Sequence, residues 1–488
     1  MSDSHSLANA IDVCNVAINS CSSEAAVSGK FLVQEITHDS CKLCWDGKYE
    51  ETTTDIVLIG VGKASVEFLS AIMKRLVEKN CRHLVRGGIA VTKFGSNQDL
   101  KQKDARSLLS ENGITCIEST HPEISNQSHD SVVAIKHALG DASKRLEGDK
   151  PVFLVVVTGG TSALCCDPAD GVSIEDMTQL NRMLLESGAD IHRINKVRRS
   201  LDRFKGGGLL RLCYSFCPEA VLWSLLVSDV IGDVHNSIGS GSGSYSPISE
   251  KVIKMDARHV LDSLFKRASL PPNVAQFFSG DSLRVQDDEA SVVKRALDSG
   301  RLMETVIVSN RIGLEAAKNQ GSKLGYNTYI LSSTLRGEAE EVGKMYSSLA
   351  ESTLVRSSSF VPPCMIICGG ETTVTMQENP GKGGRNQHLV LSFAINAHVG
   401  PFLSDCGSSS VLLVSCGTDG TDGPTDAAGA YAFFDSLKDE SVFLQATGAL
   451  RAFDSYQYFS LSNPRQSGLV HTGQTGTNVM DVQVLVIS

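Results

Sequence analysis

The residue types best suited to chemistry gather in short glycine-rich or acidic segments. Lys63 lies in the segment GVGKAS, after Gly60 and Gly62 and at the start of an expected helix. Glycines in such a turn let the backbone approach a ligand closely, and a lysine at a helix N-terminus adds positive charge for a phosphate. The segment is not a Walker A loop, because Ala64 replaces the Ser or Thr that would hold magnesium. A turn that simply needs glycine explains the segment about as well.

Two further glycine-rich segments follow apolar runs. TGGTSAL contains Gly159, Gly160, Thr161 and Ser162, and GGETTV begins with Gly369 and Gly370. In open parallel sheets, ligands bind outside the carboxyl ends of the strands, where loops offer backbone N–H groups suited to phosphate. Several such loops predict a large polar site, although a structural need for glycine is again the alternative.

Acidic residues form two loops of the same kind. The first holds Asp229 and Asp233, and the second holds Asp419, Asp422 and Asp426. Clustered carboxylates can hold Mg²⁺, or one of them can accept a proton from a substrate hydroxyl. Ordinary Asp-Gly turns are the alternative, but the density of aspartates in the second loop favours a functional role.

Cations complete the set. Arg385 follows two glycines and opens an expected helix, where its guanidinium suits a carboxylate or a transferring phosphoryl group. Arg198 and Lys205 supply further positive charge near glycines, and a solvated helix face explains these two about equally well. Together these features predict phosphoryl transfer between a nucleotide and a small anion, because that chemistry depends on positioning and charge stabilisation.

The elements that must position these residues form an alternating pattern. Helical periodicity over 64–79, 128–144 and 310–324 separates several short apolar runs, which predicts α/β domains with mainly parallel sheets. A further helix is expected to begin after Ser173, with Asp176 at the capping-box position, and to end at Gly188. The apolar runs expected to form buried strands are 56–59, 89–91, 152–157, 221–227, 306–308, 365–367 and 411–414.

Length and charge set wider limits. The chain has 488 residues, of which 41% are hydrophobic, and 45 Lys and Arg against 55 Asp and Glu give a net charge of −10. A chain of this length predicts about two to four domains. We expect an N-terminal domain over 1–245, a helical connection over 246–299 and a C-terminal domain over 300–488. The acidic balance argues against nucleic acid or an anionic membrane as the main partner.

The cysteines and the N-terminal segment bear on location. Among 14 cysteines only Cys41 and Cys44 form a C-x-x-C pair, and structural zinc would need further ligands at suitable spacing. Free thiols in a reducing compartment are the simpler interpretation. The first 21 residues lack Lys, Arg and a long apolar stretch, and no apolar run approaches the length of a membrane helix. We therefore expect a cytoplasmic protein.

The motifs, taken together, resemble those of the class II glycerate kinases, a two-domain family that ends in a MOFRL domain. The likeness covers most of the chain and is carried, in the family's order, by IGVGKAS, TGGTSALCCDPADG, SDVIGDVHNSIGSG, GGETTVTM, GKGGRNQ, GTDGTDGPTDAAGA and TGQTGTNVMD. The family implies two α/β domains, the first Rossmann-like and the second of MOFRL type, with an interdomain cleft. It also implies transfer of phosphate from ATP, with Mg²⁺, to D-glycerate, usually at the 2-hydroxyl.

The resemblance assigns roles to the residues singled out above. Lys63 and Arg385 match the family's proposed catalytic residues, and we expect Asp229 to accept the hydroxyl proton. D-glycerate and ATP are the expected partners, and a homodimer is left open. The expected nucleotide-binding residues are Gly60, Gly62, Gly159, Gly160, Thr161, Ser162, Gly369 and Gly370; the substrate-binding residues are Arg198, Lys205 and Asn386; and the metal ligands are Asp233, Asp419 and Asp422.

The chain also departs from the family pattern, which keeps alternatives open. His388 stands where the family has a Glu after GGRNQ, and if that Glu paired with Arg385 the exchange would remove its ion-pair partner. One alternative is therefore a catalytically silent protein that binds glycerate or nucleotide. Another is a nicotinamide-dependent hydroxypyruvate reductase, which is poorly supported because no G-x-G-x-x-G follows an early strand.

Overall fold

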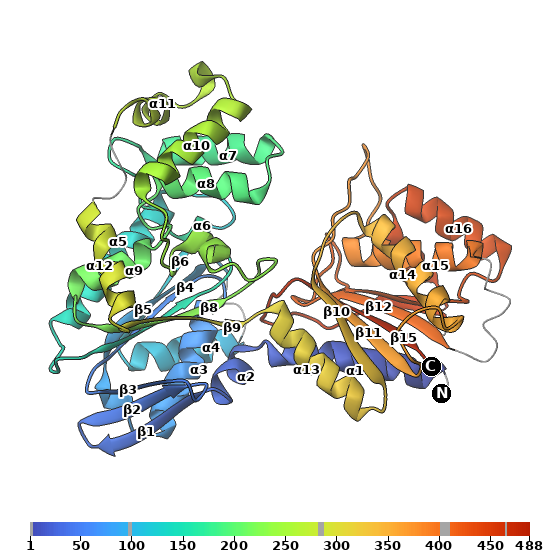
Figure 1. Cartoon of the computed structure of the whole chain (residues 1–488), viewed down its shortest axis with the longest axis horizontal. Coiled ribbons are helices and arrows are strands. Elements are labelled where there is room, and N and C mark those ends of the chain that lie inside the picture. Colours follow the sequence, from blue (N-terminus) through green and yellow to red (C-terminus); the bar gives the residue numbers. More distant parts are fainter. Residues whose placement is uncertain (1–2, 96–99, 282–286, 401–409, 464–465) are drawn as a thin grey trace. The chain divides into compact units, whose positions relative to one another are not determined.

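The computed structural model describes residues 3–95, 100–281, 287–400, 410–463 and 466–488. These residues form two compact units. The N-terminal unit comprises Ser23–Ser228 and Asp233–Ile307, and the C-terminal unit comprises Met1–Ser22, Asp229–Gly232 and Val308–Ser488. Figure 1 shows the course of the chain through both units.

A six-stranded sheet forms the centre of the N-terminal unit, with the strand order β6-β5-β4-β7-β8-β9. The four pairings that join β6, β5, β4, β7 and β8 are all parallel. All residues of β4, β7 and β8 are buried, as expected for strands covered on both faces. The strands are β4 (Ile56–Val61), β5 (Val85–Lys93), β6 (Ile114–Ser119), β7 (Val152–Val157), β8 (Val221–Val227) and β9 (Leu302–Val308).

Helices cover both faces of this sheet. In Figure 1, α3 and α4 lie on one side and α5 and α9 on the other. A further helical layer of α7, α8, α10 and α11 shares its own apolar core. The helices are α2 (Ser23–Ser28), α3 (Ser65–Glu78), α4 (Leu100–Glu111), α5 (Asn126–Ser143), α6 (Thr161–Leu164), α7 (Ile174–Glu186), α8 (Ile191–Leu201), α9 (Gly208–Phe216), α10 (Glu250–Leu264), α11 (Pro272–Ser279) and α12 (Asp287–Asp298), with short 3₁₀ turns at Arg82–Leu84, His235–Gly241 and Arg267–Ser269.

A small antiparallel sheet precedes the main sheet and contains the C-x-x-C pair. It consists of β1 (Phe31–Thr37), β2 (Ser40–Trp45) and β3 (Tyr49–Thr53). Cys41 and Cys44 both lie on β2, and because side chains alternate along a strand, residues three apart point to opposite faces. The pair therefore cannot bind one metal ion together. The cysteines in the described part of the chain are free thiols, and Cys406 lies outside it.

The C-terminal unit is built on a second six-stranded sheet, with the order β10-β11-β15-β12-β13-β14. The expectation of mainly parallel strands does not hold in this sheet: β10 and β11 are parallel, but the other four pairings are antiparallel. An apolar run buried on both faces does not reveal strand direction. The strands are β10 (Asn327–Leu335), β11 (Cys364–Gly370), β12 (Val411–Gly417), β13 (Gly429–Phe433), β14 (Ser467–Val470) and β15 (Asp481–Ile487).

Helices cover this sheet on both faces as well. The N-terminal helix α1 (Asp3–Ser20) and α13 (Asn310–Lys323) share one apolar core with the sheet, which includes Val13, Leu314 and Val484. The other core lies beneath α14 (Ala339–Leu354), α15 (Arg385–Val399), α16 (Glu440–Arg451) and α17 (Ser455–Leu461). The prediction of an α/β protein with two α/β domains is confirmed.

The division into units differs from the expected boundaries, since residues 229–232 belong to the C-terminal unit and residues 300–307 to the N-terminal unit. Residues 3–22 pack in the C-terminal unit rather than at the start of the N-terminal one. The segment 246–299 contains helices, as expected, but α10 and α11 share a core with α7 and α8 inside the N-terminal unit. No helix in the described ranges combines the length and the apolar character needed to span a bilayer.

Candidate active site

The two glycine-rich turns of the N-terminal unit lie together at the ends of β4 and β7. Gly62 has φ +126°, and a Cβ atom there would lie 2.1 Å from Thr158 Oγ1, so the close approach of the two turns requires glycine. The N–H of Lys63 donates to the carbonyl of Gly159 at 2.9 Å. The predicted phosphate loops are therefore neighbours, joined through the backbone.

Lys63 and His121 flank Gly160. A Cβ atom on Gly160 would lie 2.9 Å from Lys63 Cγ and 3.2 Å from His121 Cδ2, and Gly160 has φ +88°. Lys63 is half-buried, and its ammonium makes no ion pair with a described residue. The absence of a side chain at position 160 thus leaves room for both the lysine stem and the imidazole.

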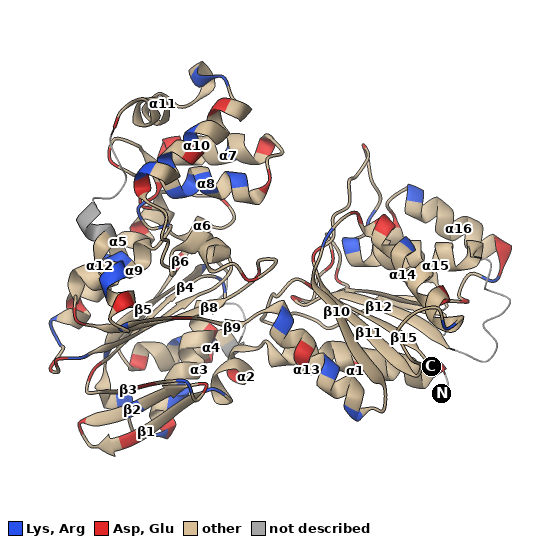
Figure 2. Cartoon of the chain, viewed as in Figure 1, with Lys and Arg blue, Asp and Glu red and all other residues tan. Residues whose placement is uncertain are grey.

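A cavity of about 130 Å³ opens beside this turn. Arg198 of α8 lies in it and donates from Nε to Asn181 Oδ1 at 2.9 Å, with a second bond from Nη2 to the same oxygen. Ser162 Oγ and Ser240 Oγ are 2.7 Å apart. Figure 2 shows several basic residues along α8. The described residues that line the cavity include no acidic side chain: they are His121, Pro122, Ile124, Gly160, Ser162, Ala163, Asn181 and Arg198.

His121 carries no charge at neutral pH. Burial, together with the charges of Lys63 and Lys93, lowers the pKa of the His121 imidazole to about 4. Neither His121 nor Asn181 was predicted from the sequence as a site residue. The available signal for His121 was its place just after β6, at the sheet edge where β4 and β7 also end.

Other predicted residues of this unit serve the fold. Gly60 lies in the buried strand β4, where an added Cβ atom would lie 3.0 Å from Leu69 Cδ1. The hydroxyl of Thr161 donates to the carbonyls of Val61 at 2.9 Å and Thr158 at 2.7 Å. Both residues shape the turn rather than face the cavity.

Lys205 does not fit its expected substrate-binding role. Its side chain is 1% exposed and its ammonium pairs with Asp202, which is 0% exposed. A second bond reaches the carbonyl of Cys165 at 3.4 Å. A buried ammonium of this kind stabilises the surrounding backbone and has no surface to offer a ligand.

In the C-terminal unit, Arg385 is held by carboxylates at the start of α15. Its Nε and Nη2 donate to Asp481 at 2.6 and 2.7 Å, and Nη1 lies 3.1 Å from Glu371 Oε1. Burial lowers the pKa of Arg385, but the hydrogen bonds and charge of Asp481 outweigh it and raise the pKa above its usual value. Burial raises the pKa of Glu371, the charge of Arg385 lowers it, and Asp481, Asp229 and Asp419 raise it further.

Asp422 caps α15. Its two oxygens accept the backbone N–H groups of Asn386 at 3.0 Å and Gln387 at 2.9 Å. Burial raises the pKa of Asp422 to about 6, and these backbone bonds oppose the rise. Asn386 is itself fully buried, and its Oδ1 accepts from Ser415 Oγ at 2.5 Å. Neither the metal role of Asp422 nor the substrate role of Asn386 fits these surroundings.

The remaining predicted residues of this unit also have structural roles. Gly369 and Gly370 are buried in β11, where a Cβ atom would lie 1.9 Å from Asn310 Oδ1 and 2.2 Å from the Leu335 carbonyl respectively. Asp419 Oδ1 accepts the N–H of Thr421 at 3.0 Å and its hydroxyl at 3.1 Å, which closes a local turn.

The expected metal ligands come from both units. Asp233 lies in the N-terminal unit, whereas Asp419 and Asp422 lie in the C-terminal unit. Within the described ranges, no group of three His, Cys, Asp or Glu side chains is arranged to hold a metal ion. Asp422, one of the residues expected as a metal ligand, is already engaged as the cap of α15.

His388 does not take part in the Arg385 ion pairs. It is 4% exposed, and its ring stacks on Phe453 with centroids 5.4 Å apart and planes 5° apart. Burial lowers the pKa of His388, and the charges of Glu340 and Glu338 oppose this. Because Asp481 and Glu371 already hold Arg385, the exchange at position 388 leaves that guanidinium paired.

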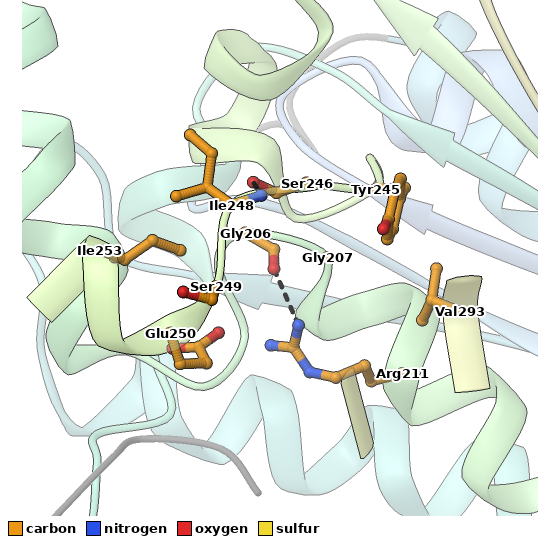
Figure 3. Close-up of a pocket in the computed structure, with 10 residues that line it drawn as sticks. All are labelled: Gly206, Gly207, Arg211, Tyr245, Ser246, Ile248, Ser249, Glu250, Ile253 and Val293. Carbon is orange, nitrogen blue, oxygen red and sulfur yellow. Dashed lines mark hydrogen bonds between the residues drawn. The ribbon is translucent and has the colours of Figure 1, made fainter. Parts of the chain in front are cut away.

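A second cavity of the N-terminal unit is shown in Figure 3. It is lined by Gly206, Gly207, Arg211, Tyr245, Ser246, Ile248, Ser249, Glu250, Ile253 and Val293. Arg211 donates to the carbonyls of Gly206 at 2.8 Å and Arg203 at 3.0 Å, so its guanidinium holds the backbone turn before α9.

The fold and the cavity beside Lys63 define a two-unit α/β protein with a cationic site at the end of a parallel sheet. Residues 9–279 match the DUF4147 family model, a domain of unknown function, and residues 364–481 match the MOFRL family. The chain belongs to the glycerate kinase family that carries a MOFRL domain.

Similar proteins support this membership. Glycerate 2-kinase of Pyrococcus horikoshii is 31% identical over 92% of this chain and 90% of its own length. Glycerate kinase of Rattus norvegicus is 32% identical over 88% of this chain and 84% of its own. A crystal structure of glycerate kinase from Thermotoga maritima is 26% identical, covers 98% of this chain and 99% of its own, and has a TM-score of 0.75.

Proposed function

We propose that the protein is an ATP-dependent kinase that phosphorylates D-glycerate, with 2-phosphoglycerate as the product. The observation that carries the proposal is the unpaired Lys63 ammonium beside a cavity that contains Arg198 and is lined by no acidic residue in the described part of the chain. Family membership supplies the reaction class. A cationic site without carboxylates favours anions such as glycerate and the phosphates of a nucleotide.

In this proposal, Lys63 stabilises the negative charge of the phosphoryl group during transfer. The substrate hydroxyl forms the new O–P bond, its proton passes to the Asp229 carboxylate, and the bond from phosphorus to the ADP oxygen breaks. Arg385 remains the second catalytic cation, and its bidentate bond to Asp481 fixes the orientation of its guanidinium. Most of the rate enhancement is expected from positioning and charge stabilisation.

ATP is the phosphate donor in this proposal. Magnesium commonly reaches kinases with the nucleotide phosphates and keeps several of its waters. Asp422 is engaged as a helix cap and Asp419 in a local turn, so no step is assigned to a protein-bound metal.

The experiment that tests this function is a product-resolved assay with ATP, Mg²⁺ and D-glycerate, in which phosphorus NMR separates the phosphoglycerate isomers. Formation of 2-phosphoglycerate supports the proposal. Formation of 3-phosphoglycerate would overturn the choice of hydroxyl and keep the kinase. Absence of both products and of ADP would reject the kinase, and oxidation of NADH with hydroxypyruvate would favour the reductase instead.

Replacing Lys63 tests the site within that assay. We expect Lys63→Ala to lower kcat by about 100-fold or more, as loss of a positioned electrostatic stabiliser typically does. Lys74→Ala is a matched control, since Lys74 lies on the following helix α3 and pairs with Glu24 at the surface. Turnover by Lys63→Ala close to that of the control would remove Lys63 from the mechanism.

A further inference from the structure

The cavity beside Lys63 contains hydrogen-bonding groups that the described protein leaves unused. Neither ring nitrogen of half-buried His121 bonds to a described residue, and Arg198 uses Nε and Nη2 for Asn181 but not Nη1. Both side chains line the same cavity. Unused donors and acceptors in a partly buried cavity are expected to face water or a ligand.

The charges in the cavity favour an anion. Arg198 is oriented by the neutral amide of Asn181 rather than by a carboxylate, so no direct partner cancels its charge at that contact. The Lys63 stem adjoins His121 across Gly160, and Lys93 also acts on the imidazole. Within the described lining of the cavity Arg198 is the one charged side chain, and its planar guanidinium matches the geometry of a carboxylate.

We propose that this cavity binds the carboxylate of D-glycerate, with Arg198 supplying the charge and His121 and Ser162 supplying neutral hydrogen-bond partners. The inference rests on the proposed function and adds a subsite to it. Ser162 is thereby moved from the nucleotide to the substrate, and His121 becomes a substrate-binding residue. Asn181 is a positioning residue that acts through Arg198.

A titration of His121 follows from this arrangement. The cations Lys63 and Lys93 hold the imidazole in its neutral form, and a bound carboxylate would offset their charges. D-glycerate should therefore raise the pKa of His121. Glycerol, which has the hydroxyls but no carboxylate, should leave it unchanged.

The first measurement uses the wild-type protein with ¹³C-labelled histidine rings, with the His121 signal identified by its loss in His121→Asn. At pH 5, saturating D-glycerate should move that signal towards the imidazolium position, and glycerol should not. No movement with D-glycerate would overturn the proposal. Movement with ATP but not with D-glycerate would assign the cavity to a phosphate and overturn it as well.

Kinetics provide an independent test. We expect Arg198→Met and His121→Phe each to raise KM for D-glycerate by about 10-fold or more, with KM for ATP nearly unchanged. His137→Phe is the matched control, because His137 is exposed on α5 outside the cavity. An unchanged KM for D-glycerate in both cavity variants would contradict the subsite while leaving the kinase in place. Absence of turnover in the wild type would instead reject the proposed function itself.

Discussion

Lys63 and Lys205 carry the same charge but have opposite surroundings. The Lys63 ammonium is half-buried beside a cavity, whereas Lys205 is fully buried against Asp202. A buried ion pair is costly to form and costly to break, so Lys205 contributes to the structure of its loop. A cation next to glycines in the sequence was therefore not enough to predict a ligand-binding residue, because burial decides which cation a ligand can reach.

Asp422 gives a pH dependence with a defined sign. Burial raises its pKa from 3.8 to about 6 in the folded protein, so the folded state binds the proton more tightly than the unfolded state. The stabilisation is fully present below about pH 4 and is lost as the pH rises through about 6. The difference between the pKa values of the unfolded and folded states corresponds to about 3 kcal/mol in the free energy of unfolding.

Denaturant unfolding followed by far-UV circular dichroism at pH 4 to 7 measures this contribution. Relative to Asp422→Asn, which cannot titrate at this position, the wild type should lose stability over that range. The Asp12→Asn variant, changed at an exposed position of α1, should follow the wild type. Parallel pH curves for wild type and Asp422→Asn would contradict the assignment.

The residues of the candidate site were predictable only in part. GVGKAS and TGGTSAL pointed to neighbouring turns. Gly160, Ser162 and Arg198 line one cavity, and the stem of Lys63 packs against Gly160. His121 and Asn181 were missed because their relevance comes from tertiary contact. Asn386, Asp422, Gly369 and Gly370 carried motif-like signals whose physical cause is a helix cap or close packing of strands.

At the scale of elements, local signals were reliable. All the apolar runs expected to form strands do lie in strands, and the helices expected over 64–79, 128–144 and 310–324 are α3, α5 and α13. Strand direction in the C-terminal sheet was not predictable. Strand β15 lies between β11 and β12, although it follows both of them at a distance along the chain. Continuous apolar character records burial on both faces and carries no information about direction.

The capping box of α7 provides a test at this scale. The structure confirms the predicted cap: Ser173 Oγ accepts the N–H of Asp176 at 3.1 Å, and Asp176 Oδ2 accepts the N–H of Ser173 at 2.9 Å. We expect Ser173→Ala to reduce the free energy of unfolding by about 1 kcal/mol. Tryptophan fluorescence in urea reports this, since both tryptophans, Trp45 and Trp223, lie in the N-terminal unit.

Ser249 supplies the control for that measurement. It occupies the N-cap of α10 but makes no side-chain capping bond. Ser249→Ala should therefore change stability by only a few tenths of a kcal/mol. An equal loss in both variants would show that the hydrogen bonds of the capping box are not the source of the effect.

At the scale of the whole molecule, the order of the chain does not follow the order of its units. The first helix belongs with elements that follow residue 307, and α1 contacts α13, β12 and β15. The sequence did not predict this packing, because the elements that α1 contacts are far from it along the chain. The family likeness established two α/β domains but did not say where the first residues pack.

A substitution in α1 should therefore act on the C-terminal unit. Val13 is fully buried in the core shared with α13, and a charge placed there would lack a partner. We expect Val13→Asp to destabilise that unit by about 3 kcal/mol or more. Hydrogen exchange with mass spectrometry should show faster exchange in 310–323 and 481–487.

Asn15→Asp introduces the same charge on the exposed side of α1. It should leave the exchange of both segments close to that of the wild type. Faster exchange confined to the N-terminal unit in Val13→Asp would contradict the placement of α1.

The position of α1 also sets an order for folding during synthesis. Residues 23–307 contain the strands of the N-terminal sheet except for Val308, the last residue of β9. The ribosome releases these residues well before it releases β15. Domains generally fold as units while the chain emerges. Helix α1 therefore leaves the exit tunnel long before β12 and β15, and the core that it shares with α13 and these strands is completed only when they emerge.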